Sequence, residues 1–416
     1  MKVCLITLGC KQNKYESDCM ANILKSNGYT ITTNLEYADI YVLNTCAVTQ
    51  EAEKKSRQYI AKFNKLNDNC KIVVCGCASE NNLSQFDNKK NVFSIIGNEA
   101  KEKILDIVNN ATKQVFDIDH KTYPRLSSPT KTTTRAHLKI QDGCNNFCSY
   151  CLIPYLRGRS RSRDIEEIIA EAHELSTHSE EIVLTGIDIS SFKVDGKLAL
   201  PILMSRLKDL SSTIRIGSLE VNVITDELLQ VLSSMPNFAP HFHLSLQSGC
   251  DKVLEKMNRH YTTQEYYDKV CLIRKYFPDA NITTDVIVGF PNETEECFEE
   301  TKKFVDKVKF SFMHIFPYSP REGTLAAKYK DLPKDIKAHR VDELEAINDK
   351  NKKLYLNKFK QNILRVLIEE EKDGYLVGYT KEYIRVYTKT QAIEMGRYYD
   401  VKVLDTYLDG VVAEIV

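Results

Sequence analysis

The chain has 416 residues, 43% of them hydrophobic and 27% charged, a composition typical of globular proteins rather than of disordered or low-complexity chains. Lysine plus arginine and aspartate plus glutamate both number 57, so the formal net charge is zero, which excludes general attraction to polyanions but not a local basic patch. No apolar run approaches the length of a membrane span, and the N-terminus reads as a buried strand without a signal-peptide cleavage pattern, so we expect a cytoplasmic protein of two or three domains.

Residues 1–112 form the first predicted domain, in which short apolar strands alternate with helical stretches. This alternation predicts a parallel sheet with helices on its faces. Cys10, Cys46 and Cys77 each follow one of the strands. Such turns gather at the carboxyl edge of a parallel sheet, where ligands bind, so we expect the three thiols to converge. The strands are predicted at residues 3–9, 39–45, 71–76 and 92–97.

Three converging thiols in a reducing compartment are more typical of a metal or cluster site than of disulfides. Cys75 competes with Cys77 for the third position. We favour Cys77 because it lies in the turn beyond the strand, while Cys75 is still in the apolar run. Three thiols would leave one iron of a four-iron cluster open. The alternative is that three buried cysteines occupy these turns by chance.

A polar stretch at residues 111–134, which ends in SSPTKTTT, reads as a linker to a second predicted domain at residues 130–358. This domain also alternates strands and helices, and its six βα units are fewer than the eight of a closed barrel. We therefore expect an α/β fold with a partial (βα)6 barrel of the TIM type. The six strands are predicted at residues 137–141, 181–186, 214–220, 242–249, 282–290 and 311–319.

The loop after the first of these strands reads GCNNFCSYCLIPYLRGRSRSR and carries Cys144, Cys148 and Cys151 in C-x3-C-x2-C spacing. Asp164 is a predicted helix N-cap with Glu167 three residues on, as in a capping box, so the motif lies between a strand and a helix. Zinc sites usually use four ligands, and no fourth cysteine or histidine is close by in the sequence. Three thiolates suit a four-iron, four-sulfur cluster with one open iron, and a zinc loop with a distant fourth ligand is the alternative.

Residues 331–358 are charged and helical, and their charge run is typical of a solvated helix face. The third predicted domain, residues 359–416, contains only short strands. Five such strands predict a small all-β barrel, a shape often used to grip nucleic acid. A barrel that binds no ligand is the alternative. The strands are predicted at residues 363–371, 374–380, 383–388, 400–408 and 411–416.

Together these motifs resemble the methylthiotransferases of the radical S-adenosylmethionine (radical SAM) superfamily, over essentially the whole chain. The cysteine loop matches the radical motif of that family, and TLGCKQNKYESD, NTCAVT and GCASE match its three N-terminal cysteine motifs. SLEVNVI, LQSGCDKVLEKMNRHYT and TTDVIVGFPNETEE match the core strands that follow. The resemblance implies an N-terminal parallel α/β cluster domain, a central radical SAM barrel and a C-terminal TRAM barrel.

Three branches of the family share this layout: two act on adenosines of tRNA, and one acts on an aspartate of a ribosomal protein. GCKQNKYESD, RGRSRSR and EIVLTGID are most similar to the branch that modifies threonylcarbamoyladenosine. The chain departs from the family pattern at Ala78 and Ser79, where tyrosine and glutamine are usual, and at Asp188, where histidine is usual. Neither departure removes a cluster ligand.

The resemblance implies two [4Fe-4S] clusters and S-adenosylmethionine as cofactors. One cluster would bind and cleave S-adenosylmethionine, and the other would carry the sulfur that is methylated and transferred to C2 of an adenine. The implied ligands are Cys144, Cys148 and Cys151 for the first cluster and Cys10, Cys46 and Cys77 for the second. The residues implied to line the S-adenosylmethionine pocket are Gly186, Glu220, Gln247, Val288 and Gly289.

The implied substrate is the threonylcarbamoyl-bearing adenosine at position 37, in the anticodon stem-loop of tRNA. An electron donor and a sulfur donor are the other implied partners, and no membrane is involved. Four arginines after the cysteine loop occupy alternate positions, which point the same way in an extended segment, so we expect them to meet successive RNA phosphates. A solvated face is the alternative. The expected RNA-binding residues, including three from the terminal barrel, are Arg157, Arg159, Arg161, Arg163, Lys381, Tyr383 and Arg385.

Other functions compete with this interpretation. A methylthiotransferase of isopentenyladenosine in tRNA, or of a ribosomal protein aspartate, would use the same two clusters. In the second case the surface of the terminal barrel should suit a protein rather than RNA. A non-catalytic iron–sulfur scaffold or redox sensor is disfavoured, because a sensor needs neither two open clusters nor a substrate domain of six units.

Overall fold

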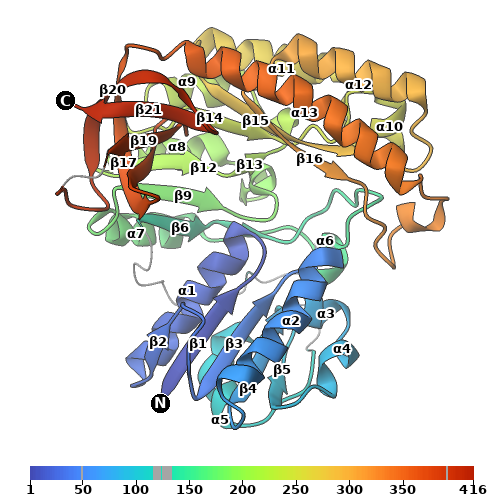
Figure 1. Cartoon of the computed structure of the whole chain (residues 1–416), viewed down its shortest axis with the longest axis vertical. Coiled ribbons are helices and arrows are strands. Elements are labelled where there is room, and N and C mark those ends of the chain that lie inside the picture. Colours follow the sequence, from blue (N-terminus) through green and yellow to red (C-terminus); the bar gives the residue numbers. More distant parts are fainter. Residues whose placement is uncertain (48–49, 116–122, 124–133, 390–391) are drawn as a thin grey trace.

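The computed structural model describes residues 1–47, 50–115, 123, 134–389 and 392–416. Figure 1 shows an N-terminal α/β unit, a central curved α/β unit and a C-terminal barrel beside the central unit. Each main sheet forms within one of the three predicted domains, although the domain limits themselves stay predictions. The predicted linker at residues 111–134 lies mostly outside the described residues. Among the described residues, no helix is both long enough and apolar enough to cross a membrane.

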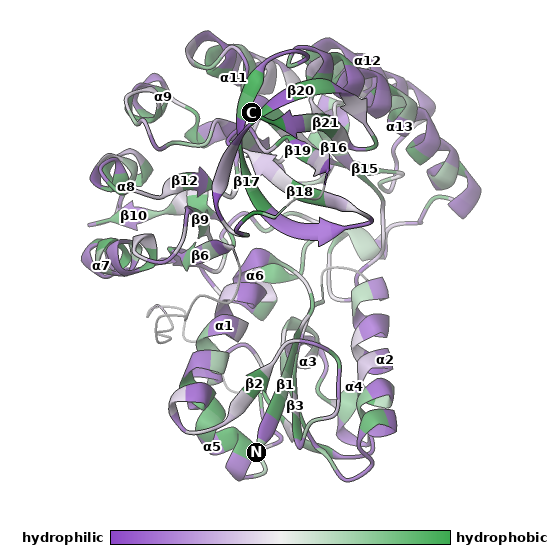
Figure 2. Ribbon diagram, turned by 60° about the vertical axis from the view of Figure 1, so that its left-hand side comes forward, coloured by the Kyte–Doolittle hydropathy of each residue, from purple (hydrophilic) through white to green (hydrophobic). Residues whose placement is uncertain are grey.

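The N-terminal unit (residues 1–112) is built on a parallel sheet of five strands in the order β2-β1-β3-β4-β5. The four predicted strands are confirmed, and β2 is an additional edge strand of three residues, too short to show a pattern. Hydrophobic colours run along the strands in Figure 2, while the flanking helices alternate hydrophilic and hydrophobic patches, as expected of helices that cover a sheet. The elements are β1 Lys2–Thr7, α1 Lys11–Ser26, β2 Thr30–Thr32, β3 Ile40–Thr45, α2 Gln50–Leu66, β4 Lys71–Gly76, α3 Cys77–Asn81, α4 Ser84–Asp87, β5 Val92–Ile95 and α5 Ile104–Asn109.

The central unit (residues 134–357) contains the six predicted strands, all parallel. They form two hydrogen-bonded groups, β6-β9-β12 and β13-β14-β15-β16, and β12 is followed by β13 after Gly217 alone. This open, curved sheet with helices outside it agrees with the expected partial barrel. The elements are β6 Arg135–Lys139, β7 Gln141–Asp142, α6 Ile153–Leu156, β8 Arg161–Ser162, α7 Ile165–Ser176, β9 Glu181–Thr185, β10 Lys193–Val194, β11 Lys197–Leu198, α8 Leu200–Leu207, β12 Thr213–Ile216, β13 Ser218–Leu219, α9 Asp226–Ser233, β14 His241–Leu244, α10 Asp251–Lys256, α11 Thr263–Tyr276, β15 Asn281–Val288, α12 Glu295–Val308, β16 Phe312–Pro317 and α13 Lys334–Asn357.

Helix α13 corrects one expectation from the sequence. It packs against β16 and α12, and two of its cations are buried. Lys337 pairs with Asp331 at 2.8 Å, and Arg340 pairs with Glu293 at 2.6 Å. The charge run is therefore not simply a solvated face, because part of it supplies ion pairs inside the structure.

The predicted cap of α7 is confirmed, since Asp164 accepts hydrogen bonds from the backbone N–H groups of Glu166 and Glu167, both at 3.0 Å.

The C-terminal unit (residues 359–416) is a closed barrel of five strands in the order β17-β18-β19-β21-β20, as predicted. Two arginines of the central unit, one buried and one partly buried, bond to it. Arg215 forms a bidentate pair with Glu181, with both N–O distances 2.8 Å, and donates to the backbone oxygen of Lys381 in the barrel at 2.9 Å. Arg135 bridges Glu181 and Glu369 of the barrel, each at 2.7 Å. The strands are β17 Ile363–Lys372, β18 Tyr375–Thr380, β19 Arg385–Lys389, β20 Tyr398–Tyr407 and β21 Gly410–Ile415.

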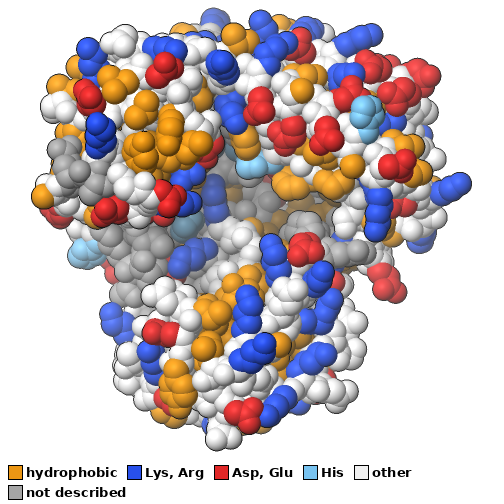
Figure 3. Space-filling model, viewed as in Figure 1, with side chains coloured by type: hydrophobic (Ala, Val, Ile, Leu, Met, Phe, Trp, Pro, Cys, Tyr) orange, Lys and Arg blue, Asp and Glu red, His pale blue; other side chains and the backbone are white. Residues whose placement is uncertain are grey.

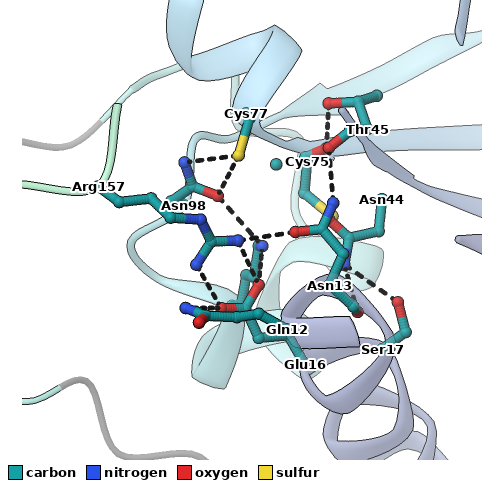
Figure 4. A network of polar contacts seen from close by, with 12 residues as sticks. Gln12, Asn13, Glu16, Ser17, Asn44, Thr45, Cys75, Cys77, Asn98 and Arg157 are labelled. Carbon is teal, nitrogen blue, oxygen red and sulfur yellow. Dashed lines mark hydrogen bonds and ion pairs between the residues drawn. The ribbon is translucent and has the colours of Figure 1, made fainter. Parts of the chain in front are cut away.

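A buried carboxylate joins the N-terminal and central units (Figure 4). Glu16, on α1, is only 2% exposed. It pairs with Arg157 at 2.7 Å, Lys101 at 2.5 Å and Lys139 at 3.1 Å, and Lys139 also pairs with Asp142 at 2.7 Å. Burial alone would raise the pKa of Glu16, but the three cations hold it well below its ordinary value. We call these five residues the Glu16 network.

We predict that Glu16→Gln lowers the free energy of unfolding by about 3–5 kcal/mol, because it leaves three buried cations short of a counter-charge. The midpoint of denaturant unfolding and the hydrogen exchange of α1 measure this loss. Glu166→Gln is the matched control: its pair with Arg206 is exposed to solvent, so the change should leave the unfolding midpoint nearly unchanged. Equal midpoints for Glu16→Gln and the wild type would contradict the prediction.

Candidate cluster and cofactor sites

The cysteine loop that follows β7 is held at both ends by regular structure. Strands β7 and β8, which flank the loop in sequence, pair antiparallel with each other. Residues 143–160 therefore form a loop whose two ends are held together. In its middle, the backbone N–H and the hydroxyl of Ser149 donate to Met257 and Lys256 at 3.0 and 2.7 Å. Asn258 donates to the backbone oxygens of Asn146 and Phe147 at 2.9 and 3.1 Å. The loop is thus fixed against the end of α10.

Each of the three sulfur atoms in this loop accepts a hydrogen bond. The backbone N–H of Asn146 donates to Cys144 and that of Ile153 to Cys151, both at 3.4 Å, and the Arg259 guanidinium donates to Cys148 at 3.2 Å. Such donors stabilise thiolates, the form that binds iron. In the described part of the chain, no three His, Cys, Asp or Glu side chains are close enough to hold a single metal ion. A cluster has a different requirement, because each thiolate binds a different iron, and the donor set of this loop fits that requirement.

A cavity of about 350 Å³ lies beside the loop and is lined by Asn145, Asp188, Glu220 and Arg259. Arg259 pairs with Glu220. One carboxylate oxygen of Asp188 is buried and has no hydrogen-bond partner among the described residues. Burial and the neighbouring Glu220 raise the pKa of Asp188 to about 6. The cavity lining therefore presents the carboxyl groups of Asp188 and Glu220, which suit a cationic group of a ligand, while the Arg259 guanidinium is already bonded to Glu220 and Cys148.

The residues expected around S-adenosylmethionine divide into two groups. Glu220 lines this cavity, but the other four are not among its lining residues. A Cβ on Gly186 would lie 3.0 Å from the Gln141 backbone oxygen, so that position serves close packing. Val288 is fully buried, Gln247 is bonded through its backbone to Asp285 at 2.9 Å, and the backbone N–H of Gly289 donates to Glu293. Sequence reasoning assigned no role to Arg259, although it lies within the LEKMNRHYT motif.

The second cysteine set lies at the carboxyl edge of the N-terminal sheet. Cys10 precedes α1, Cys46 follows β3, and Cys77 is the first residue of α3. Gly9 allows the first two turns to meet, since a Cβ there would lie 2.8 Å from the Cys46 sulfur. Cys75 lies within β4, fully buried, and burial raises its pKa to about 12. This placement favours Cys77, which begins the turn beyond the strand.

The two cysteine sets are neighbours across the boundary between the units. Leu152 and Leu156, at helix α6 of the cysteine loop, pack in the same hydrophobic core as Cys77 and Ala78. The side-chain amide of Asn98 donates both to the Leu156 backbone oxygen at 2.8 Å and to the Cys77 sulfur at 3.6 Å. Figure 4 shows Asn98, Cys77 and Arg157 grouped at this contact.

The arginine row does not present a common face to solvent, and this corrects the expectation that all four arginines meet RNA. Arg157 belongs to the Glu16 network, and Arg161 is also buried and donates to the Arg157 backbone oxygen at 2.8 Å. Arg163 pairs with Glu171 at 2.5 Å, while Arg159 lies over the Phe147 ring at 4.4 Å. The period-two argument assumed an extended segment, but Arg157 caps α6 and Gly158 has a φ of +72°.

A larger cleft of about 770 Å³ opens between the three units, and Figure 3 shows this face hollowed between the N-terminal unit and the rest. Its lining includes Cys10, Lys11, His314, Tyr383 and Arg385. Two of the expected RNA-binding residues of the barrel, Tyr383 and Arg385, thus face the same cleft as a cysteine of the second set. The third, Lys381, donates to the Pro236 backbone oxygen at 3.0 Å.

An aromatic stack forms part of the cleft wall. Tyr383 stacks on His241 at 5.0 Å and on Tyr379 at 4.6 Å between ring centroids. Arg135 and Arg215 lie over the Tyr383 ring at 5.1 and 4.7 Å. Burial, with further lowering by Arg215, holds the pKa of His241 well below its ordinary value, and burial also lowers the pKa of His314. These histidines are therefore predominantly neutral near neutral pH.

Comparisons with known proteins agree with this arrangement. Residues 138–305 match the radical SAM superfamily, and residues 2–97 match uncharacterized protein family UPF0004. The threonylcarbamoyladenosine tRNA methylthiotransferase MtaB of Bacillus subtilis is 38% identical over 96% of this chain and 92% of its own length, and that of Aquifex aeolicus is 37% identical over 89% and 93%. The tRNA-2-methylthio-N(6)-dimethylallyladenosine synthase of Thermodesulfovibrio yellowstonii is 32% identical over 99% and 97%.

A solved structure shares the fold. The radical S-adenosylmethionine methyltransferase TsrM of Kitasatospora setae, solved with cobalamin and a [4Fe-4S] cluster, superposes with a TM-score of 0.57. It covers 77% of this chain and 76% of its own, at 13% sequence identity.

We predict that the thiols of the radical loop react slowly with iodoacetamide in metal-free protein. Burial raises the pKa of both Cys144 and Cys151 to about 12, so little thiolate is present near pH 8. Mass spectrometry should show alkylation at least about tenfold slower than at the exposed Cys271, with the rate still rising above pH 10. Unfolding in denaturant should remove the difference. Equal rates in the folded protein would show that burial does not disfavour these thiolates.

Proposed function

The chain belongs to the family of radical SAM methylthiotransferases, and we propose that its substrate is the threonylcarbamoyladenosine at position 37 of tRNA, which it converts to the 2-methylthio derivative. The observation that carries the proposal is the alignment over nearly the full length of both chains. The two relatives at 38% and 37% identity are named for threonylcarbamoyladenosine. Relatives named for dimethylallyladenosine are 32–34% identical, and two further relatives named for threonylcarbamoyladenosine fall at 33% and 34%. The match to the radical SAM superfamily spans the cysteine loop and most of the central sheet.

As a radical SAM enzyme the protein uses S-adenosylmethionine and a [4Fe-4S] cluster, and we assign that cluster to Cys144, Cys148 and Cys151. We further assign a second [4Fe-4S] cluster to the N-terminal cysteines. Their placement at one sheet edge, beside helix α6, supports this assignment. When bound, these groups supply radical cleavage of S-adenosylmethionine and a transferable sulfur. The ligands of the second cluster are Cys10, Cys46 and Cys77.

The chain itself positions the cofactors and excludes water. Arg259 donates to Cys148 while it pairs with Glu220, so one side chain links the loop to the cavity wall. We propose that S-adenosylmethionine occupies the 350 Å³ cavity, where the carboxyl groups of Asp188 and Glu220 suit its cationic amine and sulfonium. Asn98 and the leucines of α6 connect the cysteine loop to Cys77.

The 770 Å³ cleft is the proposed entrance for the RNA base. It reaches Cys10 at one side and the aromatic residues of the barrel at the other. Bases in RNA loops are read after they are splayed out and placed against aromatic side chains, and the stack of Tyr383 and Tyr379 lines this cleft. The proposed RNA contacts therefore concentrate at the barrel and not at the arginine row.

The cysteine assignment predicts different results for two neighbouring cysteines. Anaerobically reconstituted wild type should hold about eight irons, four per cluster. Cys77→Ala should hold about four and still cleave S-adenosylmethionine, whereas Cys75→Ala should keep about eight, because Cys75 is part of the strand core. Iron analysis and electron paramagnetic resonance measure both. Four irons in the wild type, zinc at either site, or iron loss with Cys75→Ala instead of Cys77→Ala would refute the assignment.

The substrate is tested with purified holoenzyme and synthetic anticodon stem-loops at one fixed salt concentration. We expect methylthiolation of the stem-loop that carries threonylcarbamoyladenosine and at least about tenfold less product from an isopentenyladenosine stem-loop, measured by nucleoside mass spectrometry. The isopentenyl group lacks the carboxylate that a polar pocket would recognise. Product from only the isopentenyl RNA would move the protein to the neighbouring branch. Modification of a ribosomal protein, with no product from either RNA, would refute an RNA substrate.

A further inference from the structure

We propose that Lys11 is the specificity-determining residue that binds the carboxylate of the threonylcarbamoyl group, an inference that rests on the proposed function. Lys11 follows Cys10 directly and is the first residue of α1. It lines the 770 Å³ cleft and also an adjoining cavity of about 760 Å³ that contains Arg135 and Arg215. Lys11 is an exposed residue, and it lines the space where the substrate base is proposed to enter.

Lys11 is the lysine or arginine of the cleft lining without an ion pair among the described residues, because Glu181, the carboxylate whose charge acts on it, is itself paired with Arg215 and Arg135. The other two cations in the cleft lining are paired: Lys352 with Asp349 at 3.2 Å, and Arg385 with Asp409 at 2.9 Å. In the described part of the chain, Lys11 forms neither an ion pair nor a side-chain hydrogen bond. A cation held in a recess beside two further arginines favours an incoming anion.

The carboxylates around Lys11 already have partners. In the cleft, Asp285 accepts from His243 at 3.2 Å. In the adjoining cavity, Glu369 pairs with Arg135 at 2.7 Å, and Glu370 lies 3.5 Å from Arg385. Because these acidic groups already have partners within the protein, the part of the cleft beside Lys11 suits an acidic group of the ligand.

The chemistry of the substrate places its carboxylate in the same neighbourhood. The threonylcarbamoyl group is attached to N6 of the adenine ring that receives sulfur at C2. C2 and C6, the ring carbon that carries N6, flank N1 on one edge of the adenine. The sulfur-bearing site and the carboxylate site must therefore lie on the same edge of the base, separated by the length of the carbamoyl-threonine group. Lys11 is the residue next to Cys10, a proposed ligand of the sulfur-bearing cluster. It is therefore near enough to that cluster to contact the carboxylate of the same base. An isopentenyl group would instead place apolar atoms against an ammonium, which is unfavourable.

The test measures binding, without reductant, of the reconstituted holoenzyme to two anticodon stem-loops. One carries threonylcarbamoyladenosine, and the other carries the same group with its carboxylate converted to a carboxamide. We expect wild type to bind the carboxylate RNA about tenfold more tightly, which corresponds to about 1.4 kcal/mol. Lys11→Gln should reduce this ratio to below about twofold by weakening only the carboxylate RNA, and Lys11→Arg should retain it.

Lys14→Gln is the matched control, because it removes the same charge from the same helix at a residue paired with Asp18 at 2.7 Å. It should leave the ratio unchanged. Iron content and circular dichroism identify a variant that has lost its fold, and Lys11→Met provides a second neutral side chain in that event. The KM for the carboxylate RNA should rise in Lys11→Gln with little change in kcat, as expected for a positioning contact made already in the ground state.

The role of Lys11 would be refuted if the wild-type protein bound the carboxylate and carboxamide RNAs equally well. It would also be refuted if Lys11→Gln and Lys11→Met both kept the tenfold preference for the carboxylate RNA. The proposed function would still stand if the wild type methylthiolates the threonylcarbamoyl RNA. Conversely, a ratio that depends on Lys11, together with no methylthiolation of that RNA, would refute the proposed function and keep the carboxylate site.

Discussion

The buried carboxylate of Glu16 fixes the relation between the two cysteine sets, and the proposed chemistry depends on that relation. Glu16 lies on α1, which begins directly after Cys10, and Arg157 lies six residues after Cys151. A buried charge is stable only if ion pairs and hydrogen bonds of good geometry compensate for the lost hydration. This contact therefore allows little movement of one unit relative to the other. Although burial opposes it, Lys139 and Arg157 lower the pKa of Asp142 to about 2, so both carboxylates of the network stay charged down to acidic pH. The network's contribution to the free energy of unfolding is present above about pH 4. It is lost as the pH falls through the lowered pKa values of Glu16 and Asp142.

The regular elements could be predicted from the sequence because their signal is local. Apolar runs of strand length predicted the sheets, and the turns after those runs predicted where Cys10, Cys46 and Cys77 would gather. The arginine row could not be interpreted in this way, since the partner of Arg157 lies 141 residues earlier in the chain. Alternation along a segment says which side chains share a face, but it does not say whether that face meets solvent or another part of the protein.

The same reasoning explains why the residues expected around S-adenosylmethionine lie in different surroundings. Glu220 follows a strand and lines the cavity, whereas Gly186, at the end of another strand, lies close to Gln141 and Ile189. Position after a strand predicts the edge of the sheet on which a residue lies but not what the residue contacts there. Arg259 comes from the turn after α10 and had no such signal. Lys11 is visible in the first cysteine motif, yet its isolation from counter-charges emerges only when the central unit and the barrel are in place.

The burial of the N-terminal cysteines has a consequence for how the protein matures. Cys46 and Cys77 are 5% and 3% exposed, while Cys10 is open to solvent. Leu152 and Leu156 at helix α6 pack in the core that contains Cys77, so iron and sulfide can reach this thiol more readily when the N-terminal and central units are apart. Reconstitution of the folded protein therefore depends on opening of this interface, and the Glu16 network, which holds the two units together, slows that opening.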